Sequence, residues 1–172
     1  FQVFGDLTSC FQYFGAHNIG NPDLWGDDSM DFVDELVHPD EVDFLIPRAN
    51  FVVSTVPETP RTQNYFDKTF FSKMKNEAYF INIGRGATVV LDDLNEGLRE
   101  GDLRGAALDV FQIEPLPEDH PLWTAPGILI TPHVAGEGPY LPERRTELFL
   151  ENCKRFSDGK QLMNIVDKSN WF

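Results

Sequence analysis

The sequence has few of the features that mark disulfide-rich, metal-binding or membrane proteins. Only two of its 172 residues are cysteine, Cys10 and Cys153, and no metal-ligand spacing surrounds them. Two cysteines cannot build a disulfide scaffold, so we expect two buried thiols in a reducing compartment, with a single disulfide as the alternative. We expect no metal centre.

Long apolar runs and basic residues are also scarce. No run approaches the roughly 18 apolar residues that cross a bilayer, and the first residues lack the basic start of a signal peptide. The chain has 14 Lys and Arg against 28 Asp and Glu, a net charge of −14. Nucleic acids and anionic membranes require a basic face. We therefore expect neither as a partner, and we expect a cytoplasmic location.

Apolar residues are plentiful and indicate a packed domain. Hydrophobic residues make up 41% of the chain, and 15 of them are Phe. Strand and helix signals alternate, which predicts βαβ units and a mostly parallel sheet. We expect strands at 16–19, 51–56, 79–83, 106–110 and 128–131. We expect helices at 8–14, 31–37, 66–74, from Leu91 to Gly101, and at 142–156 with Leu148, Phe149, Cys153 and Phe156 on an inner stripe.

Three charged or titratable residues follow three of the predicted strands. Arg85 stands between two glycines after 79–83, Glu114 lies in a Pro-rich loop after 106–110, and His133 ends 128–131. The carboxyl ends of parallel strands meet at one edge, where ligands bind. A carboxylate beside an imidazole makes an acid/base pair, and Arg binds carboxylates bidentately. The trio predicts proton-coupled chemistry on an anionic carbonyl compound, although each residue alone also fits a structural or solvated role.

Two further sets of polar residues are expected to have other roles. Asp109 is a carboxylate within an apolar strand, so it needs a partner such as a ligand amide or a backbone N–H. The other histidines, His17, His38 and His120, are expected to be structural or solvated.

Several motifs then occur in one order and spacing. They are Thr55-Val56-Pro57-Glu58-Thr59-Pro60-Arg61-Thr62, the run from Met74 to Gly86, Gly105 to Phe111, Glu114 to Pro117, Pro121-Leu122-Trp123, Thr131-Pro132-His133 and Asn164 to Asp167. In these motifs the segment 51–172 resembles the cofactor-domain half of the D-isomer-specific 2-hydroxyacid dehydrogenases. That resemblance implies oxidoreductase activity with NAD or NADP and a small 2-oxo or 2-hydroxy acid substrate.

The resemblance also implies roles for individual residues. Arg85 matches the arginine that holds the 2-oxo acid, His133 matches the proton donor and acceptor, and Glu114 matches its acidic partner. Asp109 matches the residue that contacts the nicotinamide carboxamide. The remaining cofactor-binding positions implied by the match are Val56, Pro57 and Thr62 near the adenosine, Ile83 and Gly84 near the nicotinamide, and Gly136.

The sequence departs from the family pattern at its beginning. The phosphate loop G-x-G-x-x-G is absent, and only Gly5 matches its last glycine. Asp23 stands near the place of the ribose-binding acid, so the choice between NAD and NADP stays open. We therefore expect an α/β, Rossmann-like, mostly parallel sheet with flanking helices, incomplete at the first strand and glycine loop.

The predicted organisation has two parts. Residues 1–136 form a partial dinucleotide-binding domain, and residues 137–172 form a crossing helix and a C-terminal tail that would return to a missing substrate domain. We expect these residues alone to be inactive. A non-catalytic dinucleotide-sensing or assembly domain of corepressor type is the alternative function, and a remnant without a ligand is the third. The resemblance further implies a homodimer formed through the cofactor domain.

Overall fold

The structure is a computed structural model that describes residues 2–4, 17–19 and 39–165, with side chains from 41 to 165. It divides into two compact units, Phe1–His133 and Val134–Phe172. Each unit is described here by itself.

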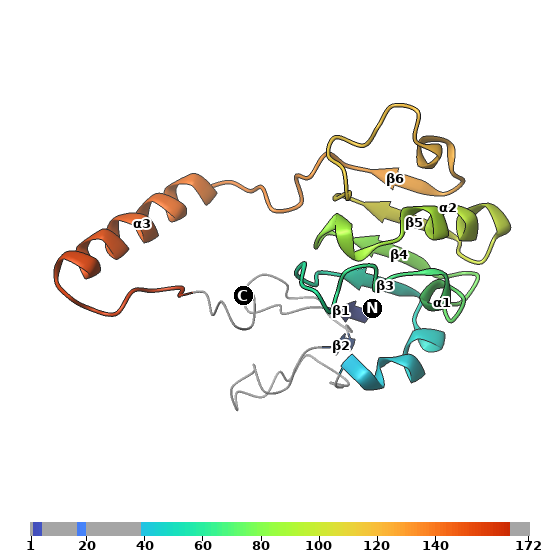
Figure 1. Cartoon of the computed structure of the whole chain (residues 1–172), viewed down its shortest axis with the longest axis horizontal. Helices are drawn as coiled ribbons and strands as arrows, with labels where there is room; N and C mark the ends of the chain where they lie inside the picture. Colours follow the sequence, from blue (N-terminus) through green and yellow to red (C-terminus); the bar gives the residue numbers. More distant parts are fainter. Residues whose placement is uncertain (1, 5–16, 20–38, 166–172) are drawn as a thin grey trace. The chain divides into compact units, whose positions relative to one another are not determined.

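The first unit is built on a parallel sheet of six strands. Their order across the sheet is β2-β1-β3-β4-β5-β6, which Figure 1 shows as a stack of arrows. Every neighbouring pair is parallel, as the alternating pattern predicts. The strands are β1 (Gln2–Phe4), β2 (His17–Ile19), β3 (Phe51–Ser54), β4 (Tyr79–Asn82), β5 (Gly105–Leu108) and β6 (Ile128–Ile130).

The first strand, which the sequence analysis expects to be incomplete, is present as β1 with three residues. β1 pairs with β2 on one side and with β3 on the other, in the middle of the sheet. The chain therefore passes from β1 to one side and later returns to the opposite side, which defines a topological switch point at the end of β1. A strand of three residues, Gln-Val-Phe, is too short to show the alternation by which strands are recognised in a sequence.

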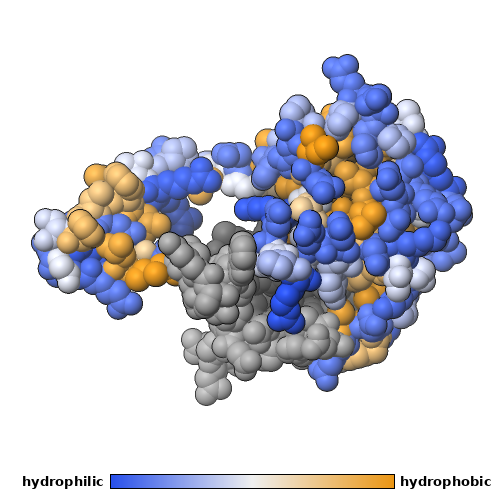
Figure 2. Space-filling view, viewed as in Figure 1, coloured by the Kyte–Doolittle hydropathy of each residue, from blue (hydrophilic) through white to orange (hydrophobic). Residues whose placement is uncertain are grey.

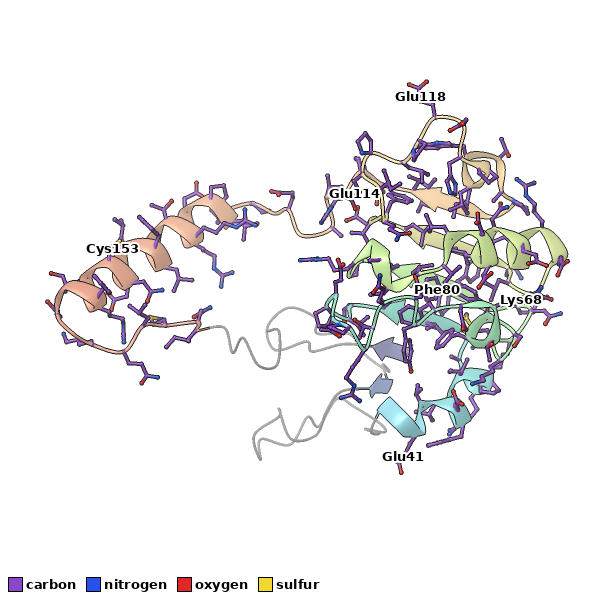
Figure 3. The ribbon with its side chains drawn as sticks, viewed as in Figure 1. Glu41, Lys68, Phe80, Glu114, Glu118 and Cys153 are labelled. Atoms are coloured by element: carbon purple, nitrogen blue, oxygen red, sulfur yellow. The ribbon has the colours of Figure 1, made fainter. Side chains whose placement is uncertain are left out.

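The core lies between the sheet and the helices that cover it. The first of these helices, α1 (Lys68–Phe71), packs against α2 (Leu91–Glu100). Aromatic rings fill much of this space: the centroid of Phe66 lies 4.8 Å from that of Phe70 and 5.0 Å from that of Phe80, which Figure 3 labels in β4. Such ring pairs add stability beyond the apolar area that they bury.

The helices α1 and α2 lie where the sequence predicts them, but α1 is shorter than predicted. Leu94 and Leu98 of α2 are buried, and Gly101 ends this helix with a φ of 80°, a left-handed value that favours glycine. α1 is much shorter than the predicted 66–74. It begins only after Asp67, whose side chain accepts the Phe70 N–H, because Phe66 bridges to Val89. Short 3-10 helices complete the unit at Pro39–Phe44, Ile46–Arg48, Gly86–Thr88 and Pro121–Thr124.

The second unit contains the long helix α3 (Leu141–Ser157), close to the predicted 142–156. The inner stripe expected on this helix is not buried: Phe149 and Phe156 are exposed, and Figure 2 shows apolar side chains along α3. Cys153, labelled in Figure 3, is a free and exposed cysteine, so the expectation of a buried thiol is wrong for it. Within the described residues of this unit, no other helix or strand covers the apolar side chains of α3.

Some predictions fall outside the described residues. They concern the helices at 8–14 and 31–37, the glycine loop with Gly5, and Cys10, Asp23 and His38.

Candidate active site

The site lies at the carboxyl edge of the sheet, where three neighbouring strands end in register. Asn82 of β4 is paired with Leu108 of β5, and Leu108 is paired with Ile130 of β6. Backbone hydrogen bonds continue the pairing one residue further: the Asp109 N–H donates to Asn82 O and the Thr131 N–H to Leu108 O, each at 3.0 Å. The loops that carry the predicted site residues therefore start side by side.

The side chains of Glu114 and His133 are hydrogen-bonded on this edge. Glu114 Oε2 lies 2.7 Å from His133 Nδ1, and Figure 3 labels Glu114 on the loop after β5. The other oxygen, Oε1, accepts the Phe111 N–H at 2.8 Å. Because an ionised carboxylate only accepts hydrogen bonds, His133 is the donor in this pair through Nδ1, and its Nε2 takes no part in the pair.

The electrostatics of the pair keep the glutamate ionised. The hydrogen bond from His133 and then the backbone hydrogen bond from Phe111 lower the pKa of Glu114 from its ordinary value of 4.5. The side chains of His133 and Glu114 are 50% and 36% exposed, so a small molecule in solution can reach them. The backbone of His133 adopts a φ of 54°, which is uncommon for a residue other than glycine.

Asp109 lies directly after β5, one strand end away from Glu114. It is 3% exposed, between the equally buried Leu108 and Val110. The Thr131 hydroxyl donates to Asp109 Oδ1 at 2.5 Å. The sequence analysis expects a partner for this carboxylate, and Thr131 is one.

Arg85 is held at the end of β4 by its own loop. The Gly84 N–H donates to Asn82 Oδ1 at 3.0 Å, and Asn82 Nδ2 donates to Arg85 O at 3.1 Å. The Thr88 hydroxyl donates to the same carbonyl at 2.6 Å. The exposed guanidinium of Arg85 folds back to donate from Nη1 to Gly84 O at 2.7 Å. The backbone of Arg85 is thus fixed by two buried polar side chains.

The two glycines beside Arg85 are required by close backbone contacts. A Cβ atom at Gly84 would lie 2.7 Å from Val56 O, and one at Gly86 would lie 1.9 Å from the carbonyl carbon of Phe111. The Arg85 loop therefore packs directly on the backbone of the loop that positions Glu114. Arg85, Glu114 and His133 are joined to one edge of the sheet through these contacts.

The other predicted cofactor positions are divided between the two units. Val56 and Pro57 follow β3, and the Thr62 hydroxyl donates to Pro57 O at 2.6 Å and accepts the Thr59 N–H at 2.8 Å. Thr62 thus shapes this loop from within. Ile83 follows β4 and donates its N–H to Ser54 O. Gly136 belongs to the second unit, so it is not grouped with the residues above.

Three residues of this edge were missed in the sequence analysis: Asn82, Thr88 and Thr131. Each is a small polar residue next to apolar ones, and Asn82 and Thr88 are completely buried. A buried polar residue needs a partner, so Asn82 between two isoleucines was a usable signal. His120 is structural as predicted, because its Nδ1 accepts the Leu122 N–H.

Two negative findings apply to the described residues. No three of their His, Cys, Asp or Glu side chains are arranged to hold a metal ion. None of their helices combines the length and the apolar composition of a bilayer-spanning segment.

Comparison with known proteins gives the family of the chain. The family model described as D-isomer specific 2-hydroxyacid dehydrogenase, NAD binding domain, matches residues 6–135. This match covers most of the chain, so the protein belongs to the D-isomer specific 2-hydroxyacid dehydrogenase family. The family and the Rossmann-like fold predicted from the sequence are both confirmed.

Individual relatives extend this finding. Glyoxylate/hydroxypyruvate reductase A of Photorhabdus laumondii is 38% identical over 128 residues, which are 74% of this chain and 40% of the relative. The same-named protein of Yersinia enterocolitica is 33% identical over 80% of this chain and 44% of its own length. The chain thus spans less than half the length of these relatives.

Solved structures agree with the fold. A D-isomer specific 2-hydroxyacid dehydrogenase from Xanthobacter autotrophicus Py2, crystallised with NADPH and MES, superposes with a TM-score of 0.81 at 28% identity, over 91% of this chain and 62% of that one. An NADPH-dependent glyoxylate/hydroxypyruvate reductase from Sinorhizobium meliloti, in complex with NADP and sulfate, has a TM-score of 0.78 at 29% identity, over 91% of this chain and 49% of that one.

Proposed function

We propose that this chain is the dinucleotide-binding part of an oxidoreductase that transfers a hydride between NAD(P)H and a small 2-oxo acid. The observation that carries the proposal is the Glu114–His133 pair, which lies 2.7 Å apart on the same sheet edge as Arg85 and Asp109. The relatives that are glyoxylate/hydroxypyruvate reductases support 2-oxo acids as the substrate class.

The arrangement of the sheet fits a dinucleotide. Its order places a topological switch point at the end of β1, and dinucleotides bind in the crevice at such a point. We assign Asp109 to the nicotinamide carboxamide, with the backbone of Ile83 and Gly84 beside the ring. Val56 and Pro57, shaped by Thr62, line the adenosine side, and Gly136 is assigned to the cofactor by resemblance. When bound, the reduced nicotinamide supplies the hydride.

His133 is the acid and base of the proposed reaction. With Nδ1 bonded to Glu114, its Nε2 donates a proton to the carbonyl oxygen during reduction and takes it back from the hydroxyl in oxidation. The ionised Glu114 stabilises the protonated imidazole and fixes its orientation. Arg85 binds the carboxylate of the 2-oxo acid through its planar guanidinium, once the bond to Gly84 O is exchanged for the ligand.

The wider organisation is part of the same proposal. We assign residues 1–136 to the dinucleotide-binding domain and residues 137–172 to a crossing helix and a tail that returns to a substrate domain. We further propose a homodimer formed through the cofactor domain and a cytoplasmic location, without nucleic acid or membrane as partner. The family resemblance supports the homodimer, and the net charge of −14 supports the exclusion of anionic partners.

The test is turnover by the protein at its native length. The protein is mixed with NADH or NADPH and with glyoxylate, hydroxypyruvate or pyruvate, and the loss of reduced nicotinamide absorbance is recorded. Oxidation that requires both the dinucleotide and the 2-oxo acid is the expected result. Dinucleotide binding without turnover would favour the sensing or assembly function, and the absence of both would contradict the proposal.

A further inference from the structure

The hydrogen bond between Thr131 and Asp109 joins two strand ends of the site. The Thr131 hydroxyl donates to Asp109 Oδ1 at 2.5 Å, from the residue after β6 to the residue after β5. The backbones are bonded as well, since the Thr131 N–H donates to Leu108 O at 3.0 Å. Both partners of the side-chain bond are therefore anchored to the sheet.

Burial makes this bond consequential for the carboxylate. Asp109 is 3% exposed, so water cannot replace a lost donor at little cost. A hydrogen bond to an ionised acceptor is shorter and stronger than one between neutral groups. The hydroxyl of Thr131 therefore holds one carboxylate oxygen in a fixed direction, as a preorganised site requires.

The position of Thr131 in the chain gives it a second connection to the site. It stands two residues before His133, and Asp109 stands two residues before Phe111, whose N–H binds Glu114. The Thr131–Asp109 and His133–Glu114 bonds thus tie the same two loops together at successive positions.

We propose that Thr131 is a positioning residue that acts through Asp109: its hydroxyl orients the buried carboxylate that receives the nicotinamide carboxamide. This inference rests on the proposed function, because it assumes that Asp109 contacts the cofactor. Thr131 does not itself touch the reacting atoms. Loss of the Thr131 hydroxyl weakens dinucleotide binding. Binding of the 2-oxo acid, which is assigned to Arg85, does not change.

The experiment compares variants with and without the hydroxyl in the native-length protein. Thr131→Val removes the hydroxyl at nearly constant shape, and Thr131→Ser keeps it. Dissociation constants for NADPH and NADH are measured by nicotinamide fluorescence, together with KM for both substrates. We expect Thr131→Val to weaken dinucleotide binding about tenfold, as the loss of one charge-assisted hydrogen bond would. Thr131→Ser should stay within about twofold of the original protein, and KM for the 2-oxo acid should not change.

A double-mutant cycle with Asp109→Asn tests whether Thr131 acts through Asp109. If it does, Thr131→Val adds little to the effect of Asp109→Asn. Thr124→Val is the matched control, because its hydroxyl also makes hydrogen bonds but precedes β6 at the far end of that strand. Thermal unfolding tests whether the variants fold. If Thr131→Val does not fold, Thr131→Ala takes its place.

The outcomes separate this inference from the proposed function. Weakened binding in Asp109→Asn with unchanged binding in Thr131→Val would overturn the role of Thr131 alone. Additive effects in the double variant, or equal losses in Thr131→Ser and Thr131→Val, would also overturn it. Unchanged dinucleotide binding in Asp109→Asn would overturn the assignment of Asp109 on which the inference rests, whereas turnover would still test the oxidoreductase proposal.

Discussion

The loop that carries Arg85 and the loop that carries Glu114 meet at one edge of the sheet but are held in different ways. Buried Asn82 and Thr88 fix the backbone of the Arg85 loop, and Gly86 packs against the backbone of Phe111. Glu114 and His133 are instead held by one exposed side-chain hydrogen bond between them and by one backbone hydrogen bond, from the Phe111 N–H to Glu114. The first arrangement ties the site to the stability of the fold, whereas the second can change with little effect on folding.

The largest expected effect is a loss of turnover without a comparable loss of stability. His133→Gln should reduce turnover by about 10²–10⁴-fold, because the proton donor is lost. Dinucleotide affinity should be nearly unchanged, and the unfolding free energy should change by no more than about 0.5 kcal/mol, since the side chain is half exposed. Steady-state kinetics and chemical denaturation measure these quantities, and undiminished turnover would remove His133 from the mechanism.

The next effect concerns the contact between the two loops. Gly86→Ala should lower the unfolding free energy by about 3 kcal/mol, because its Cβ would meet the Phe111 backbone at 1.9 Å. Gly97→Ala is the control: in α2 the nearest atom is 3.9 Å away, and alanine should add about 0.5–1 kcal/mol to stability. Denaturant unfolding measures the unfolding free energy of both variants. Equal stabilities would show that the two loops do not pack as described.

A smaller effect is expected where the buried polar groups hold Arg85. Asn82→Ala should cost about 1–3 kcal/mol of stability and raise KM for the 2-oxo acid, because the Gly84 N–H loses its acceptor. Asn95→Ala, on α2, removes an exposed side-chain hydrogen bond and serves as the control. An unchanged KM in a destabilised Asn82→Ala variant would mean that Asn82 stabilises the fold but does not position Arg85 for the substrate.

The smallest effect on stability is a dependence on pH. The pKa of Glu114 is lowered in the folded protein, chiefly by the hydrogen bond from His133. A carboxyl with a lowered folded pKa stabilises the fold above its unfolded pKa and loses this contribution as the pH falls through the folded value. The stability difference between the original protein and Glu114→Gln should therefore be present near neutral pH and vanish as the pH falls below about 4.5.

The same variant should also lower turnover, since a neutral amide replaces the charged acceptor that orients the His133 imidazole. Glu118→Gln is the control for the lost charge, because this exposed residue lies on the same connection after β5 (Figure 3). An equal loss of turnover in both variants would assign the effect to net charge and not to the Glu114–His133 pair.

Much of the fold was predictable because it depends on local patterns. Apolar runs identified β3, β4, β5 and β6, and the spacing of Leu91, Leu94 and Leu98 identified α2. β1 was missed because three residues show no period. The stripe on α3 was predicted to be buried, but an amphipathic pattern does not say what covers the helix.

The candidate site was predictable only in part. Arg85, Glu114 and His133 stood out only as a set, because each follows a predicted strand and the carboxyl ends of parallel strands meet at one edge. Asn82, Thr88 and Thr131 were missed, since their importance arises from hydrogen bonds between neighbouring strand ends or within the Arg85 loop. The need for glycine at position 86 likewise arises from a contact with Phe111, distant in sequence.

The most direct test of the central claim is a crystal structure of the native-length protein with NADP and oxamate, an unreactive analogue of a 2-oxo acid. We predict that the Arg85 guanidinium binds the oxamate carboxylate, that His133 Nε2 lies within hydrogen-bond distance of its carbonyl oxygen, and that Glu114 keeps its bond to Nδ1. Oxamate and nicotinamide bound away from these three residues would contradict the account.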